Sequence, residues 1–229
     1  LCFREKSCVK PSADGEFQVK ERNMKIEKFV LGPIGTNVYI VINEESKECF
    51  VTDPAACPAE LVSHIRNSGY QVQAVLLTHG HFDHIMGLDD FTKEFPVPVY
   101  ACREEKPLLE SAQLNSSAAY GMSYTFSRAE YVDDGQELEI AGFRIRVIHT
   151  PGHTAGGCCY YIPEEKMLIS GDTLFHGSIG RTDFPTGSSS QLIRSVREKL
   201  LVLPEDTEVY PGHMEETSIG YEKKYNPFL

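Results

Sequence analysis

One short segment constrains this chain more than any other, because it places four potential metal ligands within six residues. The segment is His79-Gly80-His81-Phe82-Asp83-His84. It follows the apolar residues 74–78, whose pattern predicts a buried strand. His79 and His81 stand two positions apart, so an extended or turning backbone can direct both rings to one side. Imidazole and carboxylate groups suit zinc, iron or manganese. The alternative is a polar loop that is rich in histidine and binds no metal.

Three later segments repeat one design: an apolar β-rich run, a turn that contains glycine, and then a residue of ligand type. They end in Pro151-Gly152-His153, Gly171-Asp172 and Pro211-Gly212-His213. Glycine lets the backbone pack close to a site, and loops on a rigid scaffold commonly carry functional residues. Each segment alone is weak evidence. With the histidine-rich segment, they predict a metal centre that is assembled from four strand ends.

The pattern between these segments predicts an α/β protein. Apolar and β-branched runs predict strands at residues 25–30, 37–43, 49–52, 72–78, 97–101, 136–140, 143–148, 166–170 and 207–210. Helical spacing and capping signals predict helices at residues 58–69, from Asp83 to about Phe95, and at about 188–203. Asp133-Asp134-Gly135 is typical of a hairpin turn. Residues 103–125 are expected to form short helices and loops over the site.

Length and local composition predict one main domain. The chain has 229 residues, within the size of one large domain. Residues 1–23 mix charges of both signs with Ser, Pro and Gly, and they lack the apolar core of a secretory signal. We expect residues 1–23 to be an extension outside the fold and residues 24–229 to form the folded domain.

Charge and hydropathy argue against two classes of partner. The formal net charge is −11 and no basic cluster stands out, which argues against nucleic acid. The apolar runs fall far short of the roughly 18–20 residues that a membrane span needs. The seven cysteines are scattered, without a C-x-x-C pair, which predicts a reducing compartment and therefore a cytoplasmic location. The adjacent Cys158 and Cys159 could be a redox pair, but a buried core strand is the favoured interpretation.

The motif set resembles that of the metallo-β-lactamase superfamily, over the chain from about Met24 to its end. The resemblance implies an α/β four-layer αβ/βα sandwich, with two mixed β-sheets face to face and helices on both outer faces. It also implies two divalent metal ions, with zinc as the first expectation and iron or manganese as alternatives. The implied ligands are His79, His81 and His153 for one ion, Asp83, His84 and His213 for the other, and Asp172 as the bridge.

The segment from Thr173 to Pro185 resembles the glyoxalase II (hydroxyacylglutathione hydrolase) branch, in its short single-domain form. Its part Gly180-Arg181-Thr182-Asp183 is shared with the persulfide dioxygenases, which resemble the same branch. This resemblance implies that Arg181 contacts the part of the substrate that derives from the thiol. A guanidinium pairs bidentately with a carboxylate, so the role is physically sensible. A surface salt bridge between Arg181 and Asp183 is the alternative. The branch more usually has glycine after its last histidine, where Met214 stands here.

We therefore expect a metal-dependent hydrolase whose substrate is a small thioester of the S-lactoylglutathione type. A metal-bridging hydroxide would attack the acyl carbon, since bound divalent metal can lower the pKa of water to about 7. Asp83 and Asp172 are the expected catalytic residues. One alternative is a mononuclear-iron persulfide dioxygenase, which would use only His79, His153 and Asp172. Another, from a different class, is a metal-stabilised binding protein without turnover. The sequence leaves the oligomeric state open.

Overall fold

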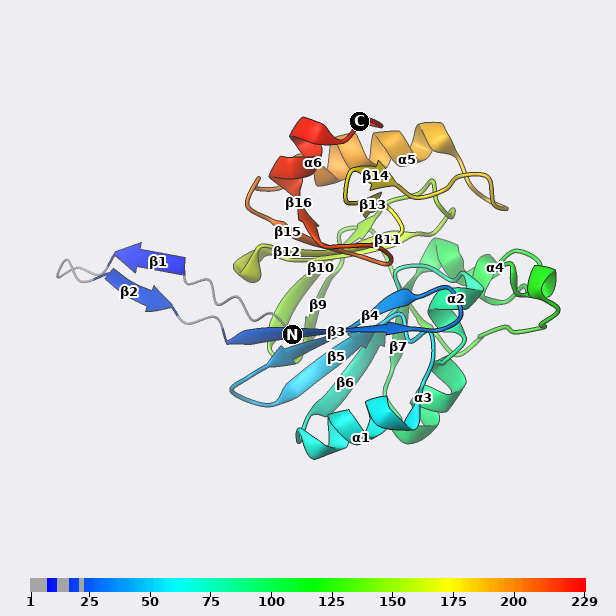
Figure 1. Cartoon of the computed structure of the whole chain (residues 1–229), viewed down its shortest axis with the longest axis horizontal. Coiled ribbons are helices and arrows are strands. Elements are labelled where there is room, and N and C mark those ends of the chain that lie inside the picture. The colour runs from blue at the N-terminus through cyan, green and yellow to red at the C-terminus, as the bar shows by residue number, and fades with distance from the viewer. Residues whose placement is uncertain (1–7, 12–16, 21–22) are drawn as a thin grey trace.

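The computed structural model describes residues 8–11, 17–20 and 23–229, and its centre is a pair of six-stranded sheets that lie face to face (Figure 1). The first sheet has the order β3-β4-β5-β6-β7-β8, with bounds Met24–Leu31, Thr36–Asn43, Glu48–Thr52, Gln71–Leu76, Val99–Cys102 and Glu130–Val132. The second has the order β16-β15-β12-β11-β10-β9, with bounds Thr217–Ser218, Glu208–Pro211, Met167–Gly171, Cys158–Ile162, Phe143–His149 and Glu137–Ile140.

Both sheets are mixed, and helices cover their outer faces. In the first sheet β3, β4 and β5 pair antiparallel, whereas β5 to β8 pair parallel. In the second sheet β12 and β15 pair parallel and the other pairs are antiparallel. Helices α1 (Ala59–Asn67) and α3 (Leu88–Glu94) lie outside the first sheet, and α5 (Ser189–Ser195) and α6 (Ile219–Tyr225) lie outside the second (Figure 1). The predicted four-layer αβ/βα sandwich is confirmed.

Shorter elements fill the connections. They are the helices α2 (Phe82–Ile85) and α4 (Lys106–Leu109), the 3₁₀ turns η1 (Arg103–Glu105), η2 (Ser117–Tyr120) and η3 (Pro163–Glu165), the π-helical turn η4 (Val196–Leu200), and the hairpin of β13 (Leu174–Phe175) and β14 (Ser178–Ile179). Helix α2, η1 and α4 belong to the connections that reach the edge where the ligand-type residues gather.

Apolar side chains form three layers, one between the two sheets and one on the outer face of each sheet, so many strands are buried along their whole length. Ile40 of β4 packs with α1 residues such as Leu61 on the outside of the first sheet. The next residue, Val41, points to the opposite side and packs between the sheets with Ile145 of β10. Successive side chains of a strand alternate between its faces, so a strand covered on both faces is apolar throughout. In the second sheet Cys158 lies between the sheets and Cys159 lies on the outer side, both as free thiols. The core-strand interpretation of this pair is confirmed.

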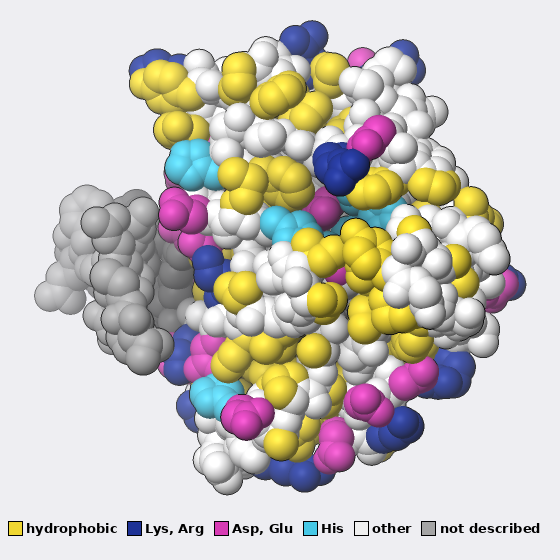
Figure 2. Space-filling model, turned by 45° about the vertical axis from the view of Figure 1, so that its right-hand side comes forward, with side chains coloured by type: hydrophobic (Ala, Val, Ile, Leu, Met, Phe, Trp, Pro, Cys, Tyr) yellow, Lys and Arg dark blue, Asp and Glu magenta, His cyan; other side chains and the backbone are white. Residues whose placement is uncertain are grey.

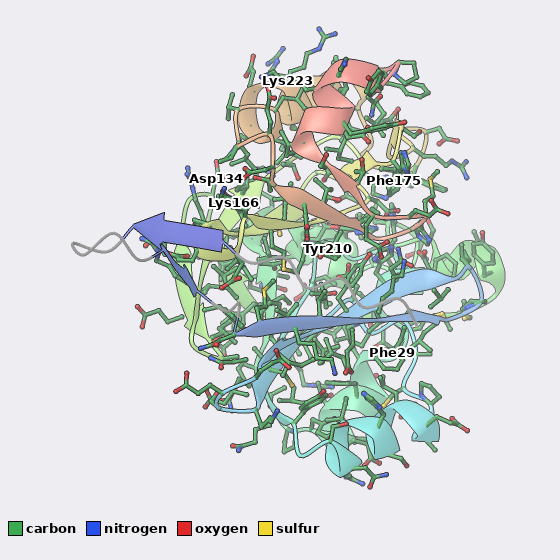
Figure 3. The ribbon with its side chains drawn as sticks, turned by 60° about the vertical axis from the view of Figure 1, so that its left-hand side comes forward. Phe29, Asp134, Lys166, Phe175, Tyr210 and Lys223 are labelled. Atoms are coloured by element: carbon green, nitrogen blue, oxygen red, sulfur yellow. The ribbon has the colours of Figure 1, made fainter. Side chains whose placement is uncertain are left out.

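The two sheets also meet through aromatic residues. Tyr210 of β15 contacts Tyr39 of β4 edge to face, with ring centroids 5.5 Å apart, and Figure 3 shows Tyr210 between the ribbons of the two sheets. The hydroxyl of Tyr39 donates to the carbonyl of Pro211 at 2.8 Å. These contacts fix the end of β15, and with it the turn that carries His213, against the first sheet.

Two local predictions were wrong. The helix expected from Asp83 to about Phe95 is broken into α2 and α3, because Gly87 packs on the preceding loop. Its N–H donates to the carbonyl of Pro54 at 2.9 Å, and a Cβ there would lie 2.4 Å from that oxygen. The turn at Asp133-Asp134-Gly135 does not close a hairpin. It joins β8 of the first sheet to β9 of the second, since β8 pairs only with β7 among the described strands.

The segment before Met24 is described only in part. β1 (Cys8–Pro11) and β2 (Phe17–Lys20) form a separate two-stranded antiparallel sheet. Residues 1–7, 12–16 and 21–22 lie outside the described residues, so the boundary expected at residues 23 and 24 stays a prediction. Among the helices that the structure describes, none is both long and apolar enough to cross a membrane.

Candidate metal centre

The seven ligand-type residues of the sequence come together at one edge of the sandwich. They follow the ends of β6, β10, β12 and β15, in connections that converge where the two sheets face each other. Figure 2 shows histidine and acidic side chains gathered in the middle of this face, with hydrophobic side chains around them. His79, His81, His84 and His153 are at most 5% exposed. The histidine-rich segment is therefore a buried site and not a polar surface loop.

Three imidazoles form a first triad, His79, His81 and His153. One ring nitrogen from each lies within 4.8 Å of the others. The Nδ1 atom of His81 is 2.9 Å from the Nε2 atom of His153. The buried Nε2 of His79 has no hydrogen-bond partner among the described residues. Buried polar atoms normally have partners, so a nitrogen without one, beside two facing nitrogens, fits a cation.

Asp83, His84 and His213 form a second triad next to the first. The Nε2 atoms of His84 and His213 are 3.4 Å apart. Asp83 Oδ2 lies 3.3 Å from His213 Nε2 and 3.7 Å from His84 Nε2. The Nδ1 side of the His84 ring faces away from this cluster, toward Asp53, which leaves Nε2 directed at the other two residues.

Asp172 lies between the two triads. Its carboxylate oxygens are 3.5 Å from His153 Nε2 of the first triad and 3.5 Å from His84 Nε2 of the second. Oδ1 of Asp172 is buried and has no hydrogen-bond partner among the described residues. Two glycines make room for it. A Cβ on Gly212 would lie 2.3 Å from this oxygen, and a Cβ on Gly180 would lie 1.8 Å from the Asp172 carbonyl oxygen.

The electrostatics of the site match bound positive charge. Burial, together with the neighbouring imidazoles, holds the pKa values of His79 and His81 well below the usual range, so both are neutral, as metal ligands must be. Burial alone would lower the pKa of His84, but the carboxylates of Asp172, Asp83 and Asp53 outweigh it and raise this pKa to about 10. The carboxylates around His84 therefore give the second triad excess negative charge, which a divalent cation would offset.

Asp53 supports the second triad and was missed as a site residue. One oxygen accepts from the Thr78 N–H at 2.8 Å, and the other accepts from the Thr78 hydroxyl at 2.6 Å and lies 3.0 Å from His84 Nδ1. Such a carboxylate fixes the tautomer and the orientation of a ligating imidazole. The sequence did hold a signal, since Asp53 follows β5 just as the ligand-type residues follow their strands.

Asn37 and Thr36 of β4 also hold the second triad. The Asn37 amide donates to the carbonyls of Pro211 and Met214 at 2.9 and 3.0 Å, on both sides of His213. The Thr36 hydroxyl donates to the carbonyl of Asp83 at 3.1 Å. No local pattern indicates these roles, because both residues lie inside an ordinary strand pattern.

Arg181 lies beside the first triad through its backbone. Its carbonyl accepts from His153 Nδ1 at 2.7 Å, which directs Nε2 of that ring toward the other imidazoles. The Arg181 guanidinium makes two hydrogen bonds with Asp183, of 3.0 and 2.7 Å, and lies 4.3 Å from the centre of the Phe184 ring. The Phe184 ring in turn contacts the His81 ring edge to face, with ring centroids 5.2 Å apart. The salt bridge with Asp183 is thus present, and a contact between Arg181 and substrate stays a prediction.

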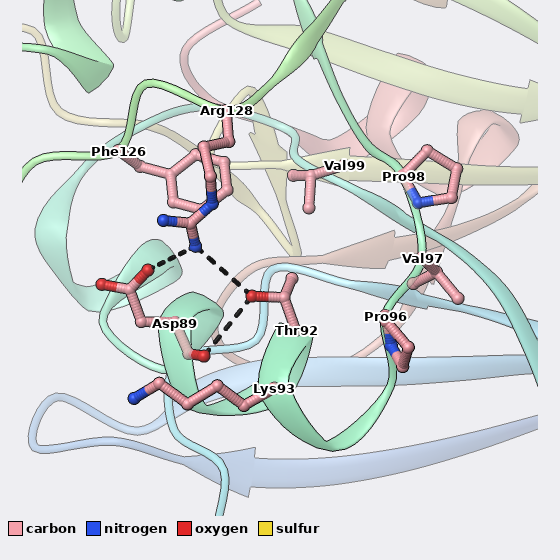
Figure 4. Close-up of a pocket in the computed structure, with 9 residues that line it drawn as sticks. All are labelled: Asp89, Thr92, Lys93, Pro96, Val97, Pro98, Val99, Phe126 and Arg128. Atoms are coloured by element: carbon pink, nitrogen blue, oxygen red, sulfur yellow. Dashed lines mark hydrogen bonds and ion pairs between the residues drawn. The ribbon is translucent and has the colours of Figure 1, made fainter.

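A separate pocket of about 520 Å³ lies beside α3 (Figure 4). Its polar groups bond one another: Arg128 donates to Asp89 at 2.6 Å, and the Thr92 hydroxyl donates to the Leu88 carbonyl at 2.7 Å. None of the seven ligand-type residues lines it. Its lining has neither convergent unpaired groups nor any of the candidate ligands, so the two triads remain the candidate functional site.

Comparison with known proteins places this geometry in a family context. The model of the metallo-beta-lactamase superfamily matches residues 31–213. A probable metallo-hydrolase of Bacillus subtilis, YqgX, is 40% identical over 208 residues, which cover 90% of this chain and 98% of that protein. The hydroxyacylglutathione hydrolase GloC of Haemophilus influenzae is 32% identical over 209 residues, with 90% and 98% covered.

Solved structures give the same result. The BLEG-1 B3 metallo-beta-lactamase superposes with a TM-score of 0.85 at 39% identity, covering 90% of this chain and 99% of that chain. A di-iron-bound form of TTHA1623 superposes with a TM-score of 0.79 at 35% identity, covering 89% and 100%. ETHE1 from Myxococcus xanthus has a TM-score of 0.72 at 26% identity, covering 89% and 84%.

Proposed function

Because this chain belongs to the metallo-beta-lactamase superfamily, we propose that it is a dinuclear metal-dependent hydrolase that cleaves thioesters of the hydroxyacylglutathione type. The family membership carries the coarser part, a metallo-hydrolase that binds divalent metal. The number of metal ions, their identity, with zinc as the first expectation, and the thioester substrate belong to the proposal.

One observation carries the dinuclear part of the proposal: the position of Asp172. Its carboxylate is 3.5 Å from a nitrogen of each triad, with an oxygen that has no other partner among the described residues. The first triad would hold one ion and the second triad the other, with Asp172 shared between them. Two ions that share a carboxylate are typical of hydrolases that activate water and stabilise the leaving group together.

The residues of the site prepare it for hydrolysis. Bound divalent ions lower the pKa of water to about 7 and stabilise negative charge on an acyl oxygen. The neutral imidazoles of the first triad offer lone pairs without adding charge. The imidazoles of the second triad keep the pKa of Asp83 well below its usual range despite its burial, so this aspartate stays ionised. The ring of Phe184 packs against the ring of His81, which is only 5% exposed.

Arg181 supports a substrate with an anionic thiol part. Its side chain is 66% exposed, packs on the Phe184 ring that contacts His81, and already pairs with a carboxylate in the geometry that a substrate carboxylate would use. A substrate would have to displace Asp183, which favours one that carries its own carboxylate. The 32% identity with a protein named hydroxyacylglutathione hydrolase supports the same class.

Arg128 offers a matched control for this role of Arg181. It pairs with Asp89, lies 4.9 Å from the centre of the Phe126 ring and is 63% exposed, but it stands at the separate pocket. We expect Arg181→Gln to raise KM for S-lactoylglutathione about 5- to 20-fold, the range of one charge-assisted hydrogen bond, and Arg128→Gln to leave it unchanged. For a lactoyl thioester of an uncharged thiol, Arg181→Gln and Arg128→Gln should have the same KM. Equal effects on both substrates would contradict the clamp role.

A mononuclear-iron persulfide dioxygenase is the second candidate, and the likeness to ETHE1 supports it. The position of His213 in the second triad favours two ions, because a mononuclear site would not need it. A metal-stabilised binding protein without turnover is the third candidate. The three candidate functions predict different metal contents and different substrates for the purified protein.

The deciding experiment combines metal analysis with a panel of substrates. Protein loaded separately with zinc, iron and manganese is assayed with S-lactoylglutathione, with glutathione persulfide plus oxygen, and with a β-lactam. We expect two ions per chain, fastest turnover of the thioester, and loss of that turnover in Asp172→Asn. One tightly bound iron together with oxygen uptake would overturn the proposal in favour of the dioxygenase. Metal binding without any turnover would favour the binding protein.

A further inference from the structure

Glu105 is a buried acidic residue that the chemistry described above does not use. It ends the 3₁₀ turn η1, just after β7, and is only 1% exposed. No lysine, arginine or histidine of the described residues forms an ion pair with it. Burying a carboxylate without a counter-ion is unfavourable. Burial raises the pKa of Glu105 to about 7, so the fold holds this group at a cost that an uncharged side chain would avoid.

The two oxygens of Glu105 bind two different ligand loops. Oε1 accepts from the N–H of Gly80 at 2.8 Å, and Gly80 lies between His79 and His81. Oε2 accepts from the N–H of Gly156 at 2.8 Å and from the hydroxyl of Thr154 at 3.0 Å. Thr154 directly follows His153. One carboxylate therefore joins the two loops that supply every member of the first triad.

The ionised form of Glu105 matches these partners. Backbone N–H groups can only donate, and one faces each oxygen, so both oxygens must accept. A glutamine amide presents one oxygen and one NH₂ group. Whichever way it is turned, its NH₂ group faces a backbone N–H, and two donors then point at each other.

The packing around Glu105 is as tight as its hydrogen bonding. A Cβ on Gly156 would lie 2.1 Å from the backbone nitrogen of Glu105, and a Cβ on Gly80 would lie 2.8 Å from the Leu109 side chain. Both loops are therefore pressed against residues 103–109. Gly80 and Thr154 each adjoin a member of the first triad. Asp83 and His84 lie further along the Gly80 segment, and neither they nor His213 make a hydrogen bond to Glu105.

We propose that Glu105 is a positioning residue for the first triad: by accepting from Gly80, Gly156 and Thr154, it holds His79, His81 and His153 at the spacing that one metal ion requires. This inference rests on the proposed metal centre. It predicts a selective effect, since groups that orient metal ligands typically contribute 10- to 100-fold to affinity. The first triad should lose that factor when Glu105 is altered, and the second triad should not.

The test measures each triad by itself. His213→Ala leaves the first triad, and His81→Ala leaves the second. Zinc and cobalt affinities are measured by competition with chelators, and the visible absorption of bound cobalt reports ligand geometry. We expect Glu105→Gln to weaken binding 10- to 100-fold and to change the cobalt spectrum in the His213→Ala background only. Equal weakening in both backgrounds, or none in either, would overturn the inference.

Glu222 gives the matched control. It is also fully buried, and it accepts from the N–H of Gly177 at 3.0 Å and from the Thr217 hydroxyl at 2.6 Å, away from both ligand loops of the first triad. Glu222→Gln should lower the melting temperature without changing the affinity of the first triad. If it matches Glu105→Gln in the His213→Ala background, the role of Glu105 is merely structural.

A second pair of variants decides the matter if Glu105→Gln does not fold. Thr154→Val removes one donor to Glu105 with little change of volume, and Thr154→Ser keeps the hydroxyl. We expect Thr154→Val to lower the metal affinity of the first triad about 3- to 10-fold, which is equivalent to one hydrogen bond. Thr154→Ser should retain the original affinity. Equal affinities would overturn the inference. If the unaltered protein binds no metal, the proposed function fails together with this inference. If the unaltered protein and the variants all bind metal equally well and hydrolyse the thioester at the same rate, only this inference fails.

Discussion

Replacing Gly212 with alanine adds a single methyl group at the point where the two triads meet. The new Cβ would lie 2.3 Å from Asp172 Oδ1 and 2.7 Å from His84 Cε1. The backbone of Gly212 is not in the left-handed region, so alanine brings no conformational strain of its own. The effect of the substitution is therefore a steric effect on the site.

The size of the effect follows from these contacts. An ordinary contact begins at 3.4 Å, so Asp172 Oδ1 and the new methyl group must separate by about 1 Å. A misplacement of about 1 Å in a catalytic site can cost about 100-fold in rate, which corresponds to about 2.7 kcal/mol of transition-state stabilisation. We expect kcat/KM for the thioester to fall about 100-fold, and metal to bind more weakly, because the shared carboxylate has moved.

Gly220 of α6 provides the control. A Cβ there would lie 2.9 Å from the Glu205 carbonyl oxygen, so it also crowds a neighbour, but away from the triads. Metal content, kcat/KM and melting temperature are measured for both variants and for the unaltered protein. We expect Gly220→Ala to keep two ions and its activity within about twofold.

One result would refute the reasoning. If Gly212→Ala binds two ions with unchanged affinity and turns over at the original rate, Asp172 does not need the position that the structure gives it. The shared-carboxylate arrangement, on which the dinuclear proposal stands, would then be wrong.

Three further predictions concern residues around the site and the fold. Asp53→Ala should weaken metal binding at the second triad about 10- to 100-fold, measured by titration calorimetry, since His84 loses the partner of its Nδ1 atom. Burial raises the pKa of the Glu27 carboxyl, but its hydrogen bonds with Lys25, His64 and Tyr70 outweigh burial and hold this pKa below its usual range. The stabilisation by ionised Glu27 is therefore present at neutral pH and lost as pH falls through that lowered pKa. Glu27→Gln should lower the free energy of unfolding by about 1 kcal/mol near pH 7, and this difference from the unaltered protein should shrink as the pH falls, measured by urea denaturation. Met214 has a φ of 71°, so Met214→Gly should raise the free energy of unfolding by up to about 1 kcal/mol, seen as a higher melting temperature.

Much of the fold followed from local pattern. The continuous apolar and β-branched runs of strands such as β4 and the terminal proline and glycine of helices such as α1 are properties of neighbouring residues, so sequence alone places these elements. The exceptions have tertiary causes. Gly87 breaks the helix that was expected after Asp83 because of a carbonyl more than thirty positions away, at Pro54. The turn at residues 133–135 joins two sheets, and its local sequence cannot show which strands its flanks will pair with.

For the site, the sequence by itself determined which seven residues lie together, because each stands at the end of a predicted strand next to a turn. The family resemblance implied how they are grouped, and the tertiary structure supplied the distances, with Asp172 3.5 Å from a nitrogen of each triad. Only the tertiary structure showed that Asp53, Asn37 and Glu105 support them from behind. It also showed that the Arg181 side chain pairs with Asp183. The physical reason is that the ability to bind a metal is a property of one residue, whereas distances and hydrogen bonds depend on how separate loops pack. No local pattern relates the loops of Gly80 and Gly156, yet the buried carboxylate of Glu105 binds both.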